Sequence, residues 1–213
     1  MRFEDLLKIV DDEPVFETGL LLAGGVNAAD VRRQLSRWEA AGRVCQVRRG
    51  LYALAPPFAR SKPHPFVVAN RMMRGSYISL QSALAHYGLI PEAVQRVTSV
   101  TTTRPGAWAT PLGSFDFRRI KVELFFGYQL LEVAPAQNAF VALAEKALLD
   151  LIYLQPGGDD RAYLEGLRLQ NLERLDLVRL QQLADRAAAP KLKRSVDNVA
   201  ALAKAEAEEY ELL

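Results

Sequence analysis

The sequence contains few of the residues that build covalent or metal-bound frameworks. It has one cysteine, Cys45, and two histidines, His64 and His86. A single cysteine excludes an internal disulfide, and so few thiolate and imidazole ligands argue against a transition-metal site. We therefore expect no metal and no cofactor.

Long apolar runs are also missing. No stretch approaches the roughly 18 consecutive apolar residues that a membrane span requires, and the opening residues MRFEDLLKIVDDEP are amphipathic and acidic, unlike a signal peptide. Hydrophobic residues make up 50% of the chain and charged residues 24%, the balance of an ordinary globular protein. These features predict a cytoplasmic protein with no membrane partner and with one large or two small domains.

Common enzyme motifs are absent. The sequence has no G-x-S-x-G, no phosphate-binding G-x-x-x-x-G-K-S/T and no H-E-x-x-H. Glu123, Glu145, Lys146 and Asp150 could form a nuclease-like set, since metal-assisted phosphodiester cleavage uses clustered carboxylates. However, Glu145 and Lys146 are adjacent on a predicted helix and point in different directions. We predict that the protein is not an enzyme and has no catalytic residues.

The net charge of +2 hides a strong segregation of charge along the chain. Residues 27–121 carry 15 Lys and Arg against four acidic residues, a net +11, whereas residues 1–26 carry −4 and residues 122–213 carry −5. A basic segment of this kind predicts a nucleic-acid partner and salt-dependent binding. The alternative is an interaction module whose basic surface binds an acidic protein.

The clearest helix lies between Asn27 and Gly42. Val31, Leu35 and Trp38 share one stripe at helical spacing, and this stripe is expected to face a core. Asn27 suits an N-cap and Gly42 suits the C-terminal stop. The opposite face is basic and includes Arg33, Ser36 and Arg37, with Arg32 at its flank.

A hairpin follows this helix. Residues 44–48 and 51–54 have the length of strands, and Arg49-Gly50 between them suits a tight turn. A helix followed by a hairpin with a basic tip is the pattern of a winged helix-turn-helix, in which the helix reads the major groove and the hairpin contacts the flanking backbone. The alternative is a surface helix whose arginines merely keep it soluble. The predicted DNA-binding residues are Arg32, Arg33, Ser36, Arg37, Arg48 and Arg49.

The domain organisation follows from the surrounding patterns. A helix over residues 2–11, a strand over 15–18 and a brief helix over 19–23 ended by Gly24-Gly25 complete a winged domain over residues 1–57. Residues 58–65 form a proline-rich linker, in which Arg60 and Lys62 could add contacts to the DNA backbone. Residues 66–213 form the C-terminal domain.

The C-terminal domain combines helices with strand-like runs. Helices are predicted over residues 64–73 and from residue 79 or 80 to Gly88, with residues 77–80 as a short transition. Strands are predicted over 97–103, 115–120 and 122–126, and helices from residue 139 to the end, where Lys146 and Asp150 can pair on the surface. Arg118, Arg119 and Lys121 either lie over DNA at a basic sheet edge or guard an edge strand against aggregation.

The predicted fold class is therefore α+β. It comprises an N-terminal winged helix-turn-helix followed by a mixed α/β C-terminal domain with a small sheet and a helical C-terminal half.

Four motifs in this order resemble one family. They are RRGLYAL from Arg48, YISLQSALAHYGLI from Tyr77, FFGYQLLEVAP from Phe125 and ALAEKALLDLIYL from Ala142. As a set they are similar to the AbiEi antitoxins of type IV toxin-antitoxin systems, which act in phage defence. The resemblance covers nearly the whole chain.

The resemblance implies two roles. The N-terminal domain would bind inverted repeats in its own promoter, as double-stranded DNA, and repress it, often cooperatively. For the assembly state we expect either a monomer in solution or cooperative assembly on the DNA. The C-terminal domain would counteract a nucleotidyltransferase-like toxin without a stable complex. Glu145, Lys146 and Asp150 match the last motif and could serve this antitoxicity, or they could orient their helix.

Overall fold

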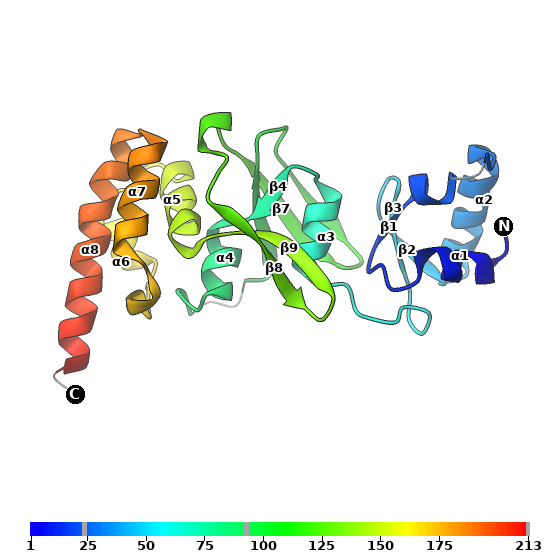
Figure 1. Ribbon diagram of the computed structural model, residues 1–213, viewed down its shortest axis with the longest axis horizontal. Helices are drawn as coiled ribbons and strands as arrows, with labels where there is room; N and C mark the ends of the chain where they lie inside the picture. The colour runs from blue at the N-terminus through cyan, green and yellow to red at the C-terminus, as the bar shows by residue number, and fades with distance from the viewer. Residues whose placement is uncertain (23–24, 92–93, 212–213) are drawn as a thin grey trace.

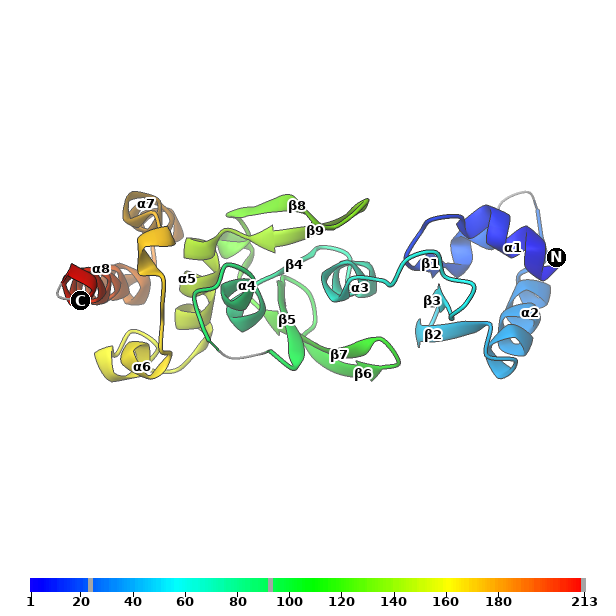
Figure 2. The same ribbon diagram turned by 90° about the horizontal axis from the view of Figure 1, so that it is seen from below.

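The computed structural model describes residues 1–22, 25–91 and 94–211 and has a mixed α+β fold with two β-sheets (Figure 1). The molecule is elongated. Its N-terminal part lies at one end, the larger sheet lies in the middle, and the last helices lie at the other end (Figures 1 and 2). Within the described ranges, no helix combines the length and the apolar character that a membrane span needs.

The N-terminal part follows the predicted order of elements. Strand β3 pairs with β1 on one side and β2 on the other, both antiparallel, in a three-stranded sheet. The strands of the hairpin have the predicted bounds, whereas the brief helix is a 3-10 helix, and Ala23 and Gly24 lie outside the described residues. The elements are α1 (Phe3–Val10), β1 (Phe16–Glu17), η1 (Thr18–Leu22), α2 (Ala28–Ala40), β2 (Val44–Arg48) and β3 (Leu51–Leu54).

This small sheet has an apolar cluster on each side. Phe16 and Val44 belong to the N-terminal cluster, in which the rings of Phe3 and Trp38 meet edge to face at 5.4 Å. Val47 and Ala53 instead belong to the main core of the chain. The N-terminal part therefore buries apolar surface against the rest of the molecule, which helps so small a unit to remain folded.

The proline-rich segment after β3 is held at both ends. Near its start, the ring of Phe58 packs edge to face on Phe3 at 4.9 Å. Near its end, the Gln137 side chain accepts a hydrogen bond from the His64 backbone N–H at 2.7 Å and donates one to the Lys62 carbonyl at 3.1 Å. The segment is a fixed connection between the two parts.

The second sheet is larger than predicted, with six strands in the order β6-β7-β5-β4-β9-β8. The β5–β7 and β4–β9 pairs are parallel, and the remaining pairs are antiparallel. Its strands are β4 (Ser76–Ile78), β5 (Arg96–Thr101), β6 (Gly106–Thr110), β7 (Gly113–Arg119), β8 (Tyr128–Ala134) and β9 (Gln137–Ala142).

Three predictions about this sheet were wrong. Residues 77–80 are not a simple transition, because β4 lies in the middle of the sheet; its three residues are all buried and show no alternation. Residues 122–126 do not form a strand, since η2 (Val122–Leu124) is a 3-10 helix. Helical structure does not begin at residue 139, because β9 occupies that region and Ala136, at φ 58°, turns the chain between β8 and β9.

Helices pack on the larger sheet. Helix α3 packs on β4 and β9, and α4 packs on β5 and α5. Helix α5 lies between the sheet and the pair α7 and α8 (Figures 1 and 2). These helices are α3 (Pro65–Met72), α4 (Leu80–His86), α5 (Ala144–Leu154), α6 (Arg161–Gly166), η3 (Leu172–Arg174), α7 (Leu177–Ala187) and α8 (Pro190–Glu211).

Candidate nucleic-acid interface

Helix α2 has the two faces that the sequence predicts. Val31, Leu35 and Trp38 are buried in the N-terminal cluster. The Asn27 side chain accepts a hydrogen bond from the Ala29 backbone N–H at 2.8 Å and so caps the helix. The exposed residues of the opposite face include Arg32, Arg33, Ser36 and Arg37.

Most of this basic face is free of ion pairs. Arg33 pairs with Asp30 one turn earlier, but the two side chains are 71% and 55% exposed, so water and salt weaken the pair. Arg32 and Arg37 have no carboxylate within ion-pair distance in the parts of the chain that the structure describes. The guanidinium groups can therefore turn toward an external anion at little cost.

The turn between β2 and β3 is fastened to the start of η1. Gly50 has φ 82°, a conformation that glycine adopts without strain. Its carbonyl accepts hydrogen bonds from the Thr18 backbone N–H at 2.9 Å and from the Thr18 hydroxyl at 3.3 Å. Arg48 and Arg49 are exposed beside this fixed turn.

The structure places the six predicted DNA-binding residues in two groups. Strand β2 runs away from α2 toward the larger sheet (Figure 2). Arg48 and Arg49 consequently border a hollow between the hairpin and the sheet, whereas the α2 residues lie at the outer end of the molecule.

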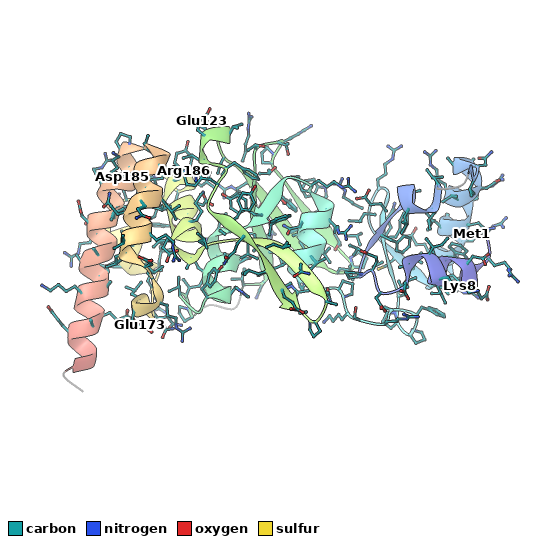
Figure 3. All side chains as sticks on the ribbon, viewed as in Figure 1. Met1, Lys8, Glu123, Glu173, Asp185 and Arg186 are labelled. Atoms are coloured by element: carbon teal, nitrogen blue, oxygen red, sulfur yellow. The ribbon has the colours of Figure 1, made fainter. Side chains whose placement is uncertain are left out.

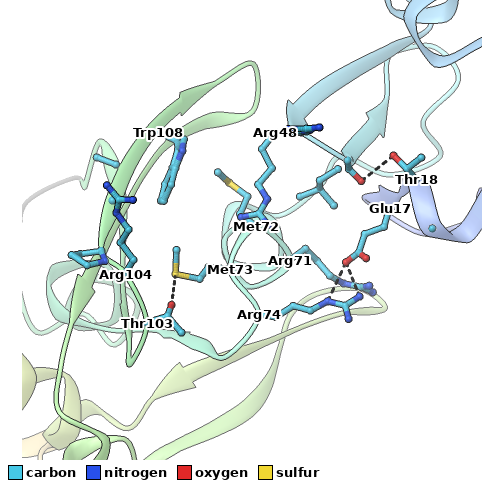
Figure 4. A pocket seen from close by; sticks show the side chains of 17 residues that line it. Glu17, Thr18, Arg48, Arg71, Met72, Met73, Arg74, Thr103, Arg104 and Trp108 are labelled. Carbon is cyan, nitrogen blue, oxygen red and sulfur yellow. Dashed lines mark hydrogen bonds and ion pairs between the residues drawn. The ribbon is translucent and has the colours of Figure 1, made fainter. Parts of the chain in front are cut away.

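We name this hollow the arginine cleft. It has a volume of about 1020 Å³ and lies between the N-terminal part, the end of α3 and the β6–β7 hairpin (Figure 4). Its charged lining residues are Glu17, Arg48, Arg49, Arg71, Arg74 and Arg104.

Sequence reasoning missed three arginines and a tryptophan of this cleft. Arg71 and Arg74 come from α3 and the turn after it, Arg104 from the turn before β6, and Trp108 from β6 itself. The sequence signals a turn at Arg104-Pro105-Gly106, but no spacing along the chain indicates that these residues face the hairpin.

The two basic residues of the linker have different surroundings. Arg60 pairs with Asp11 at 2.5 Å and with Asp12 at 3.0 Å, so it neutralises two acidic residues of the N-terminal segment. The Lys62 side chain is exposed. A contact of Arg60 with DNA would have to replace these two ion pairs.

The residues predicted for a basic sheet edge do not lie on an edge strand. Arg118 and Arg119 belong to β7, an inner strand between β6 and β5. Only β5 pairs with these two residues, because the pairing with β6 ends at Phe117. Their side chains and that of Lys121 are exposed. None of the three lines the arginine cleft.

Lys146 and Asp150 pair as predicted, but not on the surface. Their side chains are 3% and 2% exposed, because the sheet and α7 cover α5 on opposite sides. The Tyr77 and Ser79 hydroxyls donate to Asp150 Oδ2 at 3.0 and 2.8 Å, and Lys146 Nζ donates to the Tyr77 hydroxyl at 3.0 Å. Burial raises the pKa of Asp150, and the Lys146 ammonium opposes this rise.

The remaining member of that motif, Glu145, points elsewhere. Its Oε1 accepts a hydrogen bond from the Asp176 backbone N–H at 2.9 Å, and its Oε2 lies 3.7 Å from Arg179 Nη1. It therefore ties α5 to the start of α7. Glu123 projects outward from η2 (Figure 3), so the nuclease-like set of acidic residues is not assembled.

Comparisons with known proteins show a similar fold in a solved structure but identify no family. No protein-family model and no curated protein gives a significant match. Among solved structures, the chain is similar to the crystal structure of the RV2827C protein from Mycobacterium tuberculosis, with a TM-score of 0.52 and 20% identity over 94% of this chain and 78% of that chain. At this identity, the similarity shows a shared fold alone.

Proposed function

We propose that this protein is a DNA-binding transcriptional autorepressor and an antitoxin of the AbiEi kind, with its N-terminal part acting as a winged helix-turn-helix. The observation that supports this proposal best is α2, which is anchored by a buried apolar stripe and presents a basic face free for an external anion. The β2–β3 hairpin follows it, as a wing follows a recognition helix.

Arginine on such a helix can read sequence directly. A guanidinium group donates two parallel hydrogen bonds to O6 and N7 of guanine in the major groove. Both ribbon views place α2 at the outer end of the molecule, where the larger sheet does not cover it (Figures 1 and 2). Because Ala28, Ala29 and Ala40 offer little to base edges, specificity would also draw on DNA shape.

The antitoxin role rests on the four motifs that resemble the family. In this proposal the C-terminal domain counteracts a nucleotidyltransferase-like toxin without a lasting complex. Glu145, Lys146 and Asp150 would contribute by holding α5 in place, since their burial keeps them from direct contact with a partner.

Two experiments in cells test the two roles, and the first is a reporter assay for repression. The upstream DNA of the gene is joined to a reporter, and the chain is supplied from a second plasmid. We expect repression by the unaltered protein and by Arg161→Ala, which changes an exposed arginine of α6, and loss of repression by the Arg33→Ala/Arg37→Ala double variant.

The second experiment tests the antitoxin role. A neighbouring nucleotidyltransferase-like gene is expressed in cells, and we expect co-expression of this chain to relieve its toxicity. Absence of both repression and rescue would reject the proposal and favour a module that binds an acidic protein.

A further inference from the structure

The arginine cleft combines a concentrated positive charge with an open hollow. Its lining includes five arginines and one carboxylate, Glu17. Arg74 pairs with Glu17 at 2.7 Å, and Arg71 pairs with Glu13 at 2.9 Å. These two pairs leave three arginines of the lining to be accounted for.

Those three arginines are unpaired in the described structure. No carboxylate of the described residues lies within ion-pair distance of Arg48, Arg49 or Arg104. Arg48 and Arg49 are neighbours at the tip of the β2–β3 hairpin, and Arg104 comes from a second segment, the turn before β6. Arg48 and Arg104 lie on opposite walls of the cleft (Figure 4). Their convergence on one hollow distinguishes them from scattered surface charges and suits a ligand with several negative charges.

One wall of the cleft carries an aromatic side chain that is 38% exposed. Trp108 lies on the edge strand β6, with its ring edge to face on the buried ring of Phe117 at 5.5 Å. The six-membered ring of the indole lies directly against Gly106. A Cβ atom added at this glycine would come within 2.5 Å of Trp108 Cη2, so the ring leaves no room for a side chain there. A glycine and a buried phenyl ring thus set the position of an indole that remains open to the cleft.

The size of the cleft selects among negatively charged ligands. Its volume of about 1020 Å³ is at the upper end of the roughly 300–1,000 Å³ that ligand pockets span. A hollow of this volume can admit one or a few nucleotides and is too small to enclose a double helix. Guanidinium groups bind phosphates through charge-assisted hydrogen bonds, and an aromatic ring offers an unpaired base a surface on which to stack.

We propose that the arginine cleft binds a short segment of single-stranded nucleic acid, with its phosphates on Arg48, Arg49 and Arg104 and one unpaired base stacked on Trp108. This activity is separate from duplex reading by α2. It needs no residue of that helix.

Fluorescence anisotropy with labelled oligonucleotides tests this assignment on the full chain. The probes are oligothymidylate and oligouridylate of about eight nucleotides, together with an abasic strand of the same length and charge. We expect the strands with bases to bind at least about tenfold more tightly than the abasic strand, because base stacking on an aromatic ring contributes on this scale. The two base-bearing probes also show whether DNA or RNA is preferred.

The variants separate stacking from charge. Trp108→Ala should remove the preference for the base-bearing strands, and Trp108→Phe should retain part of this preference. Arg104→Ala should weaken the binding of all three probes. Matched controls are Phe140→Ala, an exposed aromatic residue of β9 outside the cleft, and Arg161→Ala. Gly106→Ala should act like Trp108→Ala, because the added methyl displaces the indole.

Two outcomes would overturn the proposal. In the first, the abasic and base-bearing strands bind equally, and the Trp108→Ala variant, which a normal melting curve shows to be folded, binds them as the unaltered protein does. The cleft would then be a general anion site. Loss of duplex binding in Arg104→Ala, with no single-strand binding by the unaltered protein, would assign the cleft to duplex DNA. Because Arg33→Ala and Arg37→Ala affect only duplex reading, failure of this inference and failure of the proposed repressor function are distinguishable.

Discussion

Arg74 donates to a single oxygen of Glu17 from both Nε and Nη2, at 3.1 and 2.7 Å. Glu17 lies in β1 and Arg74 follows α3, so this ion pair joins the N-terminal part to the rest of the molecule. Arg71 with Glu13, and Arg60 with Asp11 and Asp12, make the same kind of connection. Part of the acidic charge of residues 1–26 therefore neutralises the basic segment within the molecule.

Removing those carboxylates should strengthen binding to nucleic acid. The Glu13→Gln/Glu17→Gln variant frees Arg71 and Arg74 at the arginine cleft, so we expect tighter binding to DNA of any sequence and a steeper dependence on salt. Stability should change by less than about 1 kcal/mol, because exposed ion pairs contribute little. Anisotropy titrations at several salt concentrations and urea unfolding measure the two effects, and an unchanged salt slope would contradict the first.

The buried pair on α5 should matter far more for stability. Replacing Lys146 with alanine leaves the Asp150 carboxylate buried without its ammonium partner, which typically costs about 3–5 kcal/mol. The double variant Lys146→Met/Asp150→Leu should unfold at a higher urea concentration than either single variant, because it leaves no unpaired charge. A loss below about 1 kcal/mol in Lys146→Ala would show that the pair is not buried in solution.

Stability should also fall in mild acid. Burial and the charge of His86 lower the pKa of His64, whose Nδ1 accepts a hydrogen bond from the Phe66 backbone N–H and so must be unprotonated. As the pH falls, the unfolded chain takes up this proton first, near the ordinary pKa of 6.5. The contribution of neutral His64 to the stability of the fold is therefore complete above pH 6.5. It is lost as the pH falls from there toward the lower pKa that His64 has in the folded protein.

Asparagine at this position isolates the effect, since it retains a cap acceptor that does not titrate. Unfolding in urea at pH about 7.5 and about 5.5 should show a smaller loss of stability for His64→Asn than for the unaltered protein. An equal loss of stability in the variant and in the unaltered protein would assign the pH dependence to other groups. The first of these is His86, because burial also lowers its pKa.

Single arginines of α2 should carry measurable binding energy. We expect Arg33→Ala or Arg37→Ala to weaken operator binding by about 1–3 kcal/mol where the side chain contacts a base. Arg161→Ala, far from α2, is the control. Unchanged operator binding in both single variants and in the double variant would exclude α2 as the reading helix.

Local signals predicted the N-terminal elements well. The spacing of Val31, Leu35 and Trp38 placed the buried face of α2, Asn27 marked its start, and Gly50 marked the turn of the hairpin. Each of these features depends on residues that are close in sequence, where helical periodicity and turn conformation act directly.

Features that depend on distant segments could not be predicted in this way. Strand β4 has only three residues, and its position in the middle of the sheet depends on β5 and β9. The i to i+4 spacing of Lys146 and Asp150 indicated an ion pair, but their burial depends on the sheet and α7. The arginine cleft likewise brings together segments that no local pattern connects.

In the proposed function, the protein reads the sequence of its own operator. The most direct measurement is a gel-shift titration of the purified protein on its upstream intergenic DNA, against scrambled DNA of equal length, at about 50 mM and about 200 mM salt. We expect tighter binding to the native fragment at both salt concentrations, and weaker binding to both fragments as the salt concentration rises. Equal, weak binding to the two fragments would contradict it and leave the basic face of α2 without a role in reading sequence.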